Sequence, residues 1–294
     1  MTSEKKTVLV LGATGMLGNA VLRLFSKSDG YLACGSTRSH QPAPIPGAAA
    51  ARLVGGVDVE NPDSLAGVLA ATQPDIVINC VGVVKQLSAA DDPLVALPLN
   101  ALLAHRLARL TALAGARLIQ ISTDCVFSGK QGNYKEADLP DATDLYGRSK
   151  LLGEVDYPHA ITLRTSIIGH ELTGARSLVD WFLSQQGSTR GYRKAIFSGV
   201  PTIELARIIR DHVLPNPALR GSYHVSAAAI DKYSLLKMIA EIYRKDIEIV
   251  PSDAVEIDRS LDSERFTQST GYRAADWATL IRAMHTDKLA MAAE

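Results

Sequence analysis

The sequence predicts an α/β fold, a doubly wound parallel sheet followed by a smaller C-terminal lobe. Two observations favour this fold. Short apolar runs alternate with helical patterns over residues 1–165, as repeated strand–helix units do. The runs are rich in Val and Ile and lack strict polar alternation, which is typical of strands buried on both faces of a parallel sheet.

Six strands are expected in this part of the chain: Thr7–Leu11, Tyr31–Ser36, Arg52–Val57, Asp75–Cys80, Arg117–Ser122 and Ile161–Arg164. Helices fit between them, over Gly18–Phe25, from Asn61 onward, over Leu99–Ala114 and over Tyr146–Val155. Asn61 can cap its helix, and Pro62 and Asp63 suit a first helical turn. Further helices are expected over Thr202–Val213 and Tyr233–Arg244.

After about residue 166 the alternation becomes irregular. We therefore expect a first domain over residues 1–165 and mainly a separate, smaller lobe over residues 166–294. Residues 190–220 are expected to contribute a further strand and helix to the first domain. Two polar stretches, His40–Gly47 and Ser128–Thr143, are predicted to be surface loops.

Composition argues against several classes of function. The 294 residues carry 31 basic and 31 acidic side chains, so there is no basic excess for nucleic acid or an anionic membrane. The first apolar run is too short for a signal peptide or a membrane span, and we expect a cytoplasmic protein. Cys34, Cys80 and Cys125 lack metal or disulfide spacing and are expected to be free thiols. The histidines show no metal spacing either, and no metal site is expected.

Three glycines at intervals of three stand where the first strand becomes the first helix. A helix start has unpaired backbone N–H groups and a partial positive charge, which attract a diphosphate if no side chain blocks its approach. Gly12 would allow the tight turn, Gly15 the close approach and Gly18 the packing of helix on strand. The spacing predicts a dinucleotide-binding turn, one residue longer than the G-x-G-x-x-G pattern. A purely structural turn is the alternative.

The end of the second strand indicates which dinucleotide binds. An NAD site usually has a carboxylate there for the ribose hydroxyls, but this chain reads Ser36-Thr37-Arg38-Ser39. The guanidinium of Arg38 suits a 2′-phosphate and favours NADPH, with NADH as the alternative cofactor. Arg38 would otherwise be a solvated loop charge. Asp58, after the third strand, is expected either to bind an adenine amino group or to cap its own loop.

Tyr146 and Lys150 are four residues apart, so a helix would place them on one face. A nearby ammonium group lowers the pKa of a phenol, which is otherwise a poor acid or base near neutral pH. The pair alone is common by chance. Here it follows a strand that ends in Ser122-Thr123-Asp124 and would bring a hydroxyl to the carboxyl edge of the sheet, where α/β proteins bind ligands.

Taken in order, six segments resemble one known family. They are the glycine turn, Ile121–Gly129 (ISTDCVFSG), Tyr146–Lys150 (YGRSK), Leu163–Ser166 (LRTS), Gly199–Thr202 (GVPT) and Arg259–Asp262 (RSLD). The chain resembles the extended short-chain dehydrogenase/reductases, and among them the dTDP-4-dehydrorhamnose reductase (RmlD-like) family, over most of its length. The resemblance implies a Rossmann domain, a substrate-binding lobe, and an NADPH-dependent reductase of a nucleotide-linked 4-keto-6-deoxy sugar for surface polysaccharide synthesis.

The resemblance also assigns roles to residues. Tyr146 would donate a proton to the developing alkoxide, Lys150 would lower the Tyr146 pKa and bind the nicotinamide ribose, and Thr123 would bind the carbonyl oxygen. The residues implied to contact the cofactor are Gly12, Thr14, Gly15, Met16, Leu17, Gly18, Arg38, Asp58, Cys80, Val81, Gly82, Tyr146 and Lys150. Those implied to contact the substrate are Lys85, Asp124, Cys125, Ile167 and Arg259.

Some of these assignments have plainer alternatives. Arg259 suits the substrate diphosphate, but also a surface ion pair with Asp258 or Asp262. Lys85 and its neighbour Gln86 would otherwise belong to a solvated loop. Asp124 would otherwise orient a loop, and Asn100 is expected only as a cap or a helix-packing residue.

The chain also departs from the family pattern at Cys125 and Ile167, where the family usually has Tyr and often Trp. Losing two aromatic rings would change the surface that receives a sugar, so a dTDP-linked and a UDP-linked substrate are both retained.

Two other functions fit the same residues. An epimerase or dehydratase that keeps NAD bound would use the same three catalytic side chains without net consumption of cofactor. A non-catalytic regulatory subunit would only bind the dinucleotide, as one relative of this family does for a methionine adenosyltransferase. The intact Thr123, Tyr146 and Lys150 argue against that subunit. The oligomeric state stays open, and a homodimer is common in such folds.

Overall fold

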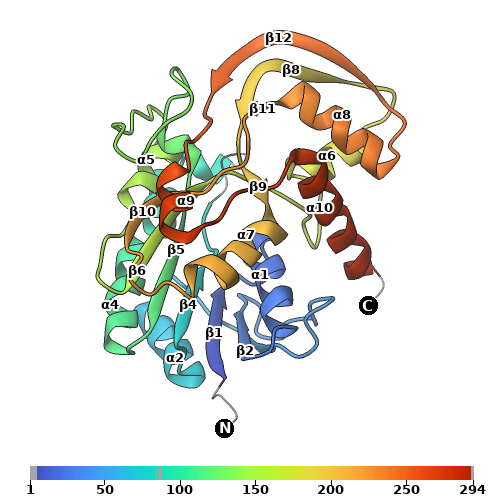
Figure 1. Ribbon diagram of the computed structural model, residues 1–294. Helices are drawn as coiled ribbons and strands as arrows, with labels where there is room; N and C mark the ends of the chain where they lie inside the picture. Colours follow the sequence, from blue (N-terminus) through green and yellow to red (C-terminus); the bar gives the residue numbers. More distant parts are fainter. Residues whose placement is uncertain (1–4, 84, 86–87, 293–294) are drawn as a thin grey trace.

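The central sheet has seven strands in the order β10-β6-β5-β4-β1-β2-β3, and all its neighbouring strands run parallel (Figure 1). The computed structural model describes residues 5–83, 85 and 88–292. The strands of this sheet are β1 (Lys6–Leu11), β2 (Tyr31–Ser36), β3 (Arg52–Val54), β4 (Ile76–Asn79), β5 (Arg117–Thr123), β6 (Ala160–Thr165) and β10 (Gly221–His224). Because β2 and β3 lie on one side of β1 and β4 on the other, the sheet is doubly wound, as the sequence predicts.

Helices cover both faces of this sheet, and each face has its own apolar core. The covering helices are α1 (Met16–Ser26), α2 (Pro62–Thr72), α4 (Leu103–Leu113), α5 (Leu145–Leu152) and α7 (Thr202–Ile208), and α10 (Trp277–Ala292) packs on α7. Val8 and Val10 of β1 belong to the core that includes α1 and α7, which lie next to each other in Figure 1. Leu9 and Leu11 belong to the core with α2 and α4. Successive β1 residues are thus buried on opposite faces, which explains the unbroken apolar run.

The predicted strands and helices agree with the structure to within a few residues, apart from three differences. The third strand pairs only over Arg52–Val54 and does not continue to Val57. Two predicted helices contain wider, π-helical stretches: η2 (Leu97–Leu102) precedes α4, and η4 (Ile209–Val213) follows α7. A π-helical turn shifts the side chains that follow it around the helix, so the 3.6-residue period could not locate these stretches.

A second sheet lies at the far end of the molecule from the N-terminus (Figure 1). It has the order β11-β8-β12, with β8 (Ser188–Phe197), β11 (Ile230–Asp231) and β12 (Glu248–Asp258). The other elements of this half are β7 (Ile167–Ile168), α6 (Leu178–Ser184), β9 (Val200–Pro201), α8 (Lys232–Tyr243) and α9 (Glu264–Thr270). Helix α7 falls inside the 190–220 range, and β10 rejoins the large sheet just beyond it. The division of the chain at residue 165 stays a prediction.

The thiols of Cys34, Cys80 and Cys125 are free, in agreement with the sequence prediction. Cys34 is buried in β2, and the other two lie half-buried after β4 and β5. Within the described residues, no helix has the length and the apolar character that crossing a bilayer requires.

Strand β10 ends in a fully buried histidine, His224. His224 Nδ1 lies 3.0 Å from the Tyr134 carbonyl oxygen, and Nε2 lies 3.3 Å from Arg164 Nη1. Nδ1–H therefore donates to the carbonyl and Nε2 accepts from the guanidinium, which requires a neutral ring. Burial, and then the positive charge of Arg164, lower the pKa of His224 from 6.5 to about 4.

This histidine makes folding dependent on pH. Because the folded pKa is depressed, the unfolded chain binds the extra proton, so stability is complete above pH 6.5 and falls as the pH drops towards about 4. The difference between a pKa of 6.5 and one of about 4 corresponds to roughly 3–4 kcal/mol. Urea unfolding of the wild type and of His224→Gln at several pH values measures it. The difference between their unfolding free energies should shrink as the pH falls; a constant difference would contradict the assignment.

Candidate functional site

The glycine turn joins β1 to α1 at the carboxyl edge of the sheet. Gly12 has a φ of +77°, which favours glycine. A Cβ on Gly18 would overlap the Gly12 carbonyl oxygen, so helix and turn pack closer than any other residue allows. Gly15 is the N-cap of α1, with an N–H that donates to Gly12 O at 3.0 Å. Among the described residues no side chain caps this helix, so its first-turn N–H groups face outward without a protein acceptor.

The end of β2 holds this turn in place. The Gly12 N–H donates to Ser36 Oγ at 3.3 Å, and the Ala13 N–H donates to the Ser36 carbonyl at 3.1 Å. The buried Thr37 hydroxyl donates to Ser39 O, so both hydroxyls are used within the protein. Arg38 is exposed, and in the described part of the chain its guanidinium has no hydrogen bond or ion pair. A free cation therefore lies beside the turn, with no carboxylate at the strand end.

Asp58 forms the loop cap that was one of its two expected roles. Its Oδ1 accepts from the Glu60 N–H at 3.0 Å, and its own N–H donates to Ser64 Oγ at 3.0 Å. Asn61 accepts from the Asp63 and Ser64 N–H groups and caps α2, as predicted. An adenine contact by Asp58 stays a prediction.

The segment Cys80-Val81-Gly82 connects the glycine turn to the region around Lys150. An ideal Cβ on Gly12 would lie 3.0 Å from Val81 Cγ2, and one on Gly82 would lie 3.7 Å from Lys150 Nζ. Asn79, the last residue of β4, fixes this segment by accepting from the Val81 N–H at 3.1 Å. The Lys150 ammonium group thus lies across a short loop from the dinucleotide-type turn.

Thr123, Tyr146 and Lys150 meet at the same edge of the sheet. Thr123 ends β5, and its side chain lies close enough to Tyr146 to act on the pKa of the phenol. Asp144 caps the helix that carries Tyr146 and Lys150, because its Oδ1 accepts from the Gly147 N–H at 2.7 Å. Lys150 is buried, and its Nζ donates to the Ile121 carbonyl of β5 at 2.7 Å. The three side chains brought together by the sequence argument are therefore neighbours.

The expected effect of Lys150 on Tyr146 differs from what the structure shows. Burial raises the pKa of Tyr146 above its ordinary value, and the nearby Cys125 thiol and the carboxyl groups of Asp124 and Asp144 raise it further. The hydrogen bond from Thr123 lowers it. The prediction that Lys150 gives Tyr146 a lowered pKa is therefore wrong for the protein alone, because the ammonium group is bound to a backbone carbonyl.

Lys150 also has an altered pKa. Burial lowers it to about 8, and the negative charge of Glu154 acts in the opposite direction. The ammonium form therefore predominates near neutral pH, although by a smaller margin than for an exposed lysine.

The five residues expected on the substrate side differ in their distance from Thr123 and in their exposure. Asp124 and Cys125 lie beside Thr123: the Thr123 hydroxyl donates to Asp124 Oδ1 at 3.0 Å, and the Cys125 N–H donates to Thr123 Oγ1 at 3.1 Å. Lys85 is exposed and pairs with Asp144 at 2.6 Å, and its expected neighbour Gln86 lies outside the described residues. Ile167, in β7, is half-buried and pairs with the β9 backbone.

Arg259 completes the substrate-side set. Its Nε donates to the Phe127 carbonyl at 2.9 Å, and its charge acts on Asp124, Cys125 and Asp144. Within the described chain Arg259 forms no ion pair with Asp258 or Asp262, which was the alternative. Asp258 instead accepts a hydrogen bond from Ser260, and Asp262 accepts one from the Glu264 N–H. The guanidinium therefore faces the edge that carries Thr123 and Tyr146.

The sequence argument missed two contributors. Lys232, the first residue of α8, lies close enough for its charge to lower the Asp124 pKa, and no motif marks it. Asn100, expected only as a cap or packing residue, lies in the π-helical stretch η2. Its Oδ1 accepts from the Val83 N–H at 3.0 Å and its Nδ2 donates to Ser149 Oγ at 3.1 Å, which joins the β4 loop to α5.

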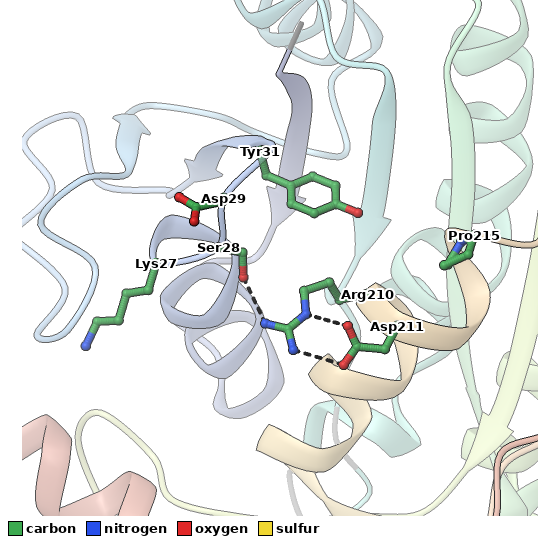
Figure 2. Close-up of a pocket in the computed structure, with 7 residues that line it drawn as sticks. All are labelled: Lys27, Ser28, Asp29, Tyr31, Arg210, Asp211 and Pro215. Carbon is green, nitrogen blue, oxygen red and sulfur yellow. Dashed lines mark hydrogen bonds and ion pairs between the residues drawn. The ribbon is translucent and has the colours of Figure 1, made fainter. Parts of the chain in front are cut away.

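A separate surface pocket of about 510 Å³ lies away from these residues (Figure 2). It is lined by residues after α1, at the start of β2 and in η4, and so lies at the opposite, amino edge of the sheet. There Arg210 binds Asp211 through two nitrogens and also donates to Ser28 Oγ at 3.0 Å. The guanidinium is therefore satisfied within the protein, and this open pocket has no connection to the glycine turn.

Comparison with known proteins agrees with the segments quoted above. A sequence model of the family described as the RmlD substrate binding domain matches residues 6–287. The chain belongs to this family. Methionine adenosyltransferase 2 subunit beta of Danio rerio is 31% identical to it over 253 residues, 81% of this chain and 74% of that protein. The probable low-salt glycan biosynthesis reductase Agl14 of Haloferax volcanii is 32% identical over 167 residues, 54% of this chain and 52% of that protein.

Solved structures share the fold of this RmlD-family chain over nearly all of its length. The dTDP-4-dehydrorhamnose reductase of Bacillus anthracis, in complex with NADP, has a TM-score of 0.79 at 20% identity and covers 98% of this chain and 100% of its own. A hypothetical dTDP-4-dehydrorhamnose reductase of Sulfolobus tokodaii has a TM-score of 0.74 at 25% identity and covers 92% of this chain and 98% of its own. WbmG of Bordetella bronchiseptica, in complex with NAD and UDP, has a TM-score of 0.77 at 16% identity and covers 98% of this chain and 97% of its own.

The turn of this RmlD-family chain fits a dinucleotide. Its glycines leave the approach to the first turn of α1 clear, and the uncapped N–H groups there are donors for a diphosphate. The unpaired Arg38 is a donor for one further phosphate. The residues present therefore match the charge and the shape of a phosphorylated dinucleotide.

Proposed function

We propose that this protein is an NADPH-dependent reductase of a nucleotide-linked 4-keto-6-deoxy sugar that serves surface polysaccharide synthesis. The observation that carries the proposal is the meeting of Thr123, Tyr146 and Lys150 beside the glycine turn, with the Cys80–Gly82 loop between them. The two dTDP-4-dehydrorhamnose reductase structures named above share the fold, and one of them was solved with NADP. A probable glycan biosynthesis reductase is among the sequence relatives.

Bound NADPH would supply the hydride that reduces the ketone. In the same step the carbonyl oxygen would take the proton of the Tyr146 hydroxyl, so a C–H bond and an O–H bond would form on the substrate, while the carbonyl π bond, the phenol O–H bond and the C–H bond that held the hydride would break. Lys150, fixed by the Ile121 carbonyl, would place a positive charge beside the ribose of bound NADPH. Thr123, at the same edge of the sheet, would hold the carbonyl oxygen in reach of Tyr146.

The substrate diphosphate is assigned to the cationic side of the same edge. Arg259 and Lys232 both act on Asp124, so two positive groups from different segments converge there. A guanidinium binds phosphate oxygens through two parallel hydrogen bonds. Cys125 and Ile167, in place of larger aromatic residues, leave room for a substituted sugar, which suits a dTDP-linked or a UDP-linked substrate. A homodimer is part of the same proposal, and light scattering would measure it.

The preference for NADPH is tested at Arg38. Arg38→Ala removes the one guanidinium expected at the 2′-phosphate, and a charged hydrogen bond of this kind contributes ~1.5–3 kcal/mol. The KM for NADPH should therefore rise by about tenfold or more, and the KM for NADH should barely change. Steady-state kinetics with both cofactors measures this, and NADH is the internal control. Equal increases for both would remove the assignment.

The substrate class is tested by thermal shift with a panel of dTDP- and UDP-sugars in the presence of NADPH. A ligand that binds only the folded protein raises the melting temperature. Sugar nucleotides should raise it further than the free nucleoside diphosphates do. If no member of the panel adds to the effect of NADPH, the proposed substrate class is wrong.

A regulatory subunit is the second candidate function, and the relative from Danio rerio favours it, because that protein is named as a subunit of a methionine adenosyltransferase. Such a subunit would bind a methionine adenosyltransferase stably and would turn over no sugar nucleotide. Co-purification of the two proteins, together with assays on the substrate panel, separates the candidates. An epimerase or dehydratase would convert the sugar with no net loss of NADPH.

A further inference from the structure

A series of side-chain hydrogen bonds runs from the glycine turn to the last helix of the protein. Asn19 Nδ2 donates to the Gly15 and Met16 carbonyl oxygens at 2.9 and 3.1 Å. Asn19 Oδ1 accepts from Arg23 Nε at 3.3 Å. The two terminal nitrogens of Arg23 donate to the two carboxylate oxygens of Asp287 at 2.6 and 2.7 Å. Because Asp287 lies on α10, three side chains join the turn to that helix.

These three side chains, which we call the α1–α10 relay, leave little freedom for the Asn19 amide. Asn19 is fully buried, and Arg23 is 6% exposed. Since a guanidinium nitrogen only donates, Arg23 Nε must face the oxygen of the Asn19 amide, and the amide nitrogen must then face the carbonyls of α1. The Asp287 carboxylate holds Arg23 through two parallel hydrogen bonds, a geometry that fixes direction as well as strength.

The carbonyls that Asn19 binds belong to the peptide groups whose opposite ends face the expected diphosphate. The Gly15 carbonyl shares a planar peptide group with the Met16 N–H, and the Met16 carbonyl shares one with the Leu17 N–H. These N–H groups lie in the first turn of α1, which no side chain caps within the described residues. A hydrogen bond to a carbonyl orients its peptide group and polarises the N–H at the other end. Asn19 therefore holds two diphosphate donors of the turn from behind.

We propose that Asp287 is a positioning residue for the dinucleotide: through Arg23 and Asn19 it fixes the peptide groups that bind the diphosphate. Cofactor binding and the packing of α10 then stabilise each other, because coupling between two equilibria is reciprocal. This inference rests on the dinucleotide binding that the proposed function includes. It goes beyond that function by giving the last helix a part in cofactor affinity.

The first test is the affinity of Asp287→Asn for NADPH and for NADH, measured by fluorescence titration. The variant keeps the size of the side chain but removes its charge and one of the two acceptor oxygens for Arg23. Substitutions along a coupled network change an affinity by about two- to thirtyfold. A loss in this range is expected for both cofactors alike, because both carry the diphosphate, whereas Arg38→Ala should affect NADPH alone.

Asp276→Asn is the matched control for this titration. Asp276 precedes the opposite end of α10, where it binds the backbone and the hydroxyl of Thr279. The control also removes an aspartate charge next to α10, but it leaves the relay intact. Its affinity for both dinucleotides should equal that of the wild type, and a loss as large as in Asp287→Asn would overturn the inference.

A combined variant separates positioning from folding. Asp287→Asn leaves the buried Arg23 with a weaker partner, which also destabilises the protein. Arg23→Met together with Asp287→Leu leaves no buried charge unpaired, so urea unfolding should show much of the stability restored. This variant still lacks the hydrogen bond that orients the Asn19 amide, so its affinity for both dinucleotides should stay low. Wild-type affinity in the folded combined variant would overturn the inference.

A double-variant cycle tests the route through Asn19. Asn19→Ala removes the contacts to the two α1 carbonyls, so the relay no longer reaches the turn. Asp287→Asn should therefore change the NADPH affinity much less in this background than in the wild type. An equal change in both backgrounds would overturn the role given to the relay.

The reverse direction is measured by hydrogen exchange of the backbone amides of α10. Saturating NADPH should slow exchange in this helix of the wild type, because the bound cofactor strengthens the relay. The slowing should be smaller in Asn19→Ala saturated with NADPH, where the relay is interrupted. Equal slowing in the two proteins would contradict the reciprocal coupling.

None of these measurements needs a substrate, which separates the relay from the reductase activity. Weakened binding in the variants, with no turnover of any keto-sugar nucleotide by the wild type, would contradict only the proposed function. Turnover by the wild type, with unchanged dinucleotide affinity in Asp287→Asn and in the combined variant, would contradict only this inference. A folded wild type that binds neither dinucleotide would contradict both.

Discussion

Tyr146→Phe is expected to lower turnover of a keto-sugar nucleotide by about 10²–10⁴-fold, the range of a lost general acid. The substitution removes one hydroxyl and keeps the ring that fills the space beside Thr123. The affinity for NADPH should stay the same, because the cofactor is assigned mainly to the glycine turn, Arg38 and Lys150. Stopped-flow turnover and fluorescence titration of NADPH measure the two quantities separately.

Tyr157→Phe is the control for this experiment. It also deletes a phenol hydroxyl, but that group lies 3.4 Å from His105 Nδ1 and outside the site. Turnover should be unchanged in the control. If Tyr146→Phe retained wild-type turnover, the catalytic assignment would be wrong whatever the cofactor affinity.

Arg164→Met is expected to destabilise the fold by about 3–5 kcal/mol, because it leaves a buried carboxylate without its partner. Arg164 Nε and Nη2 bind the two oxygens of Glu154 at 2.8 and 2.7 Å, and the side chains are 7% and 9% exposed. The Ser122 hydroxyl also donates to Glu154, at 2.7 Å. The pair therefore joins β5, β6 and the end of α5 directly behind the catalytic side chains.

Two further variants make this prediction specific. Glu154→Gln combined with Arg164→Met removes both charges and should recover much of the lost stability, because no buried charge is then unpaired. Arg193→Met breaks an exposed pair with Asp253, with side chains 54% and 45% exposed, and should cost far less than Arg164→Met, because solvent screens an exposed ion pair. Urea unfolding measures all of them. Equal losses for Arg164→Met and Arg193→Met would contradict the role of the buried pair.

Much of the first half of the fold could be predicted from the sequence because local signals there agree with one another. Strand β1 is apolar at every position from Val8 to Leu11, and the structure buries these four residues completely. Asn61 and Pro62 marked the start of α2, where both local propensity and capping favour a helix. The Rossmann-type sheet follows from such repeated units.

The later elements were harder to predict for a physical reason. The β8–β12 sheet pairs residues about sixty positions apart, such as Ser188 and Glu248, and no local pattern encodes that pairing. The π-helical stretch η2 places Asn100 between the β4 loop and Ser149, a contact that depends on tertiary packing.

The site was predictable where spacing alone sets the geometry. Tyr146 and Lys150 share a helix face, and Thr123 ends a neighbouring strand, so all three had to meet at one edge. Hydrogen-bond partners were not predictable. The Ile121 carbonyl binds Lys150 Nζ and Asp124 binds the Thr123 hydroxyl, and burial is the largest cause of the raised Tyr146 pKa.

The central claim is most directly tested by the stoichiometry of one reaction. The wild-type protein is mixed with NADPH and a dTDP- or UDP-linked 4-keto-6-deoxy sugar, and the loss of NADPH absorbance is compared with the reduced sugar formed. The reductase account predicts one NADPH oxidised for each ketone reduced. Conversion of the sugar with no net oxidation of NADPH, or no conversion of any such sugar by a folded protein that binds NADPH, would contradict it.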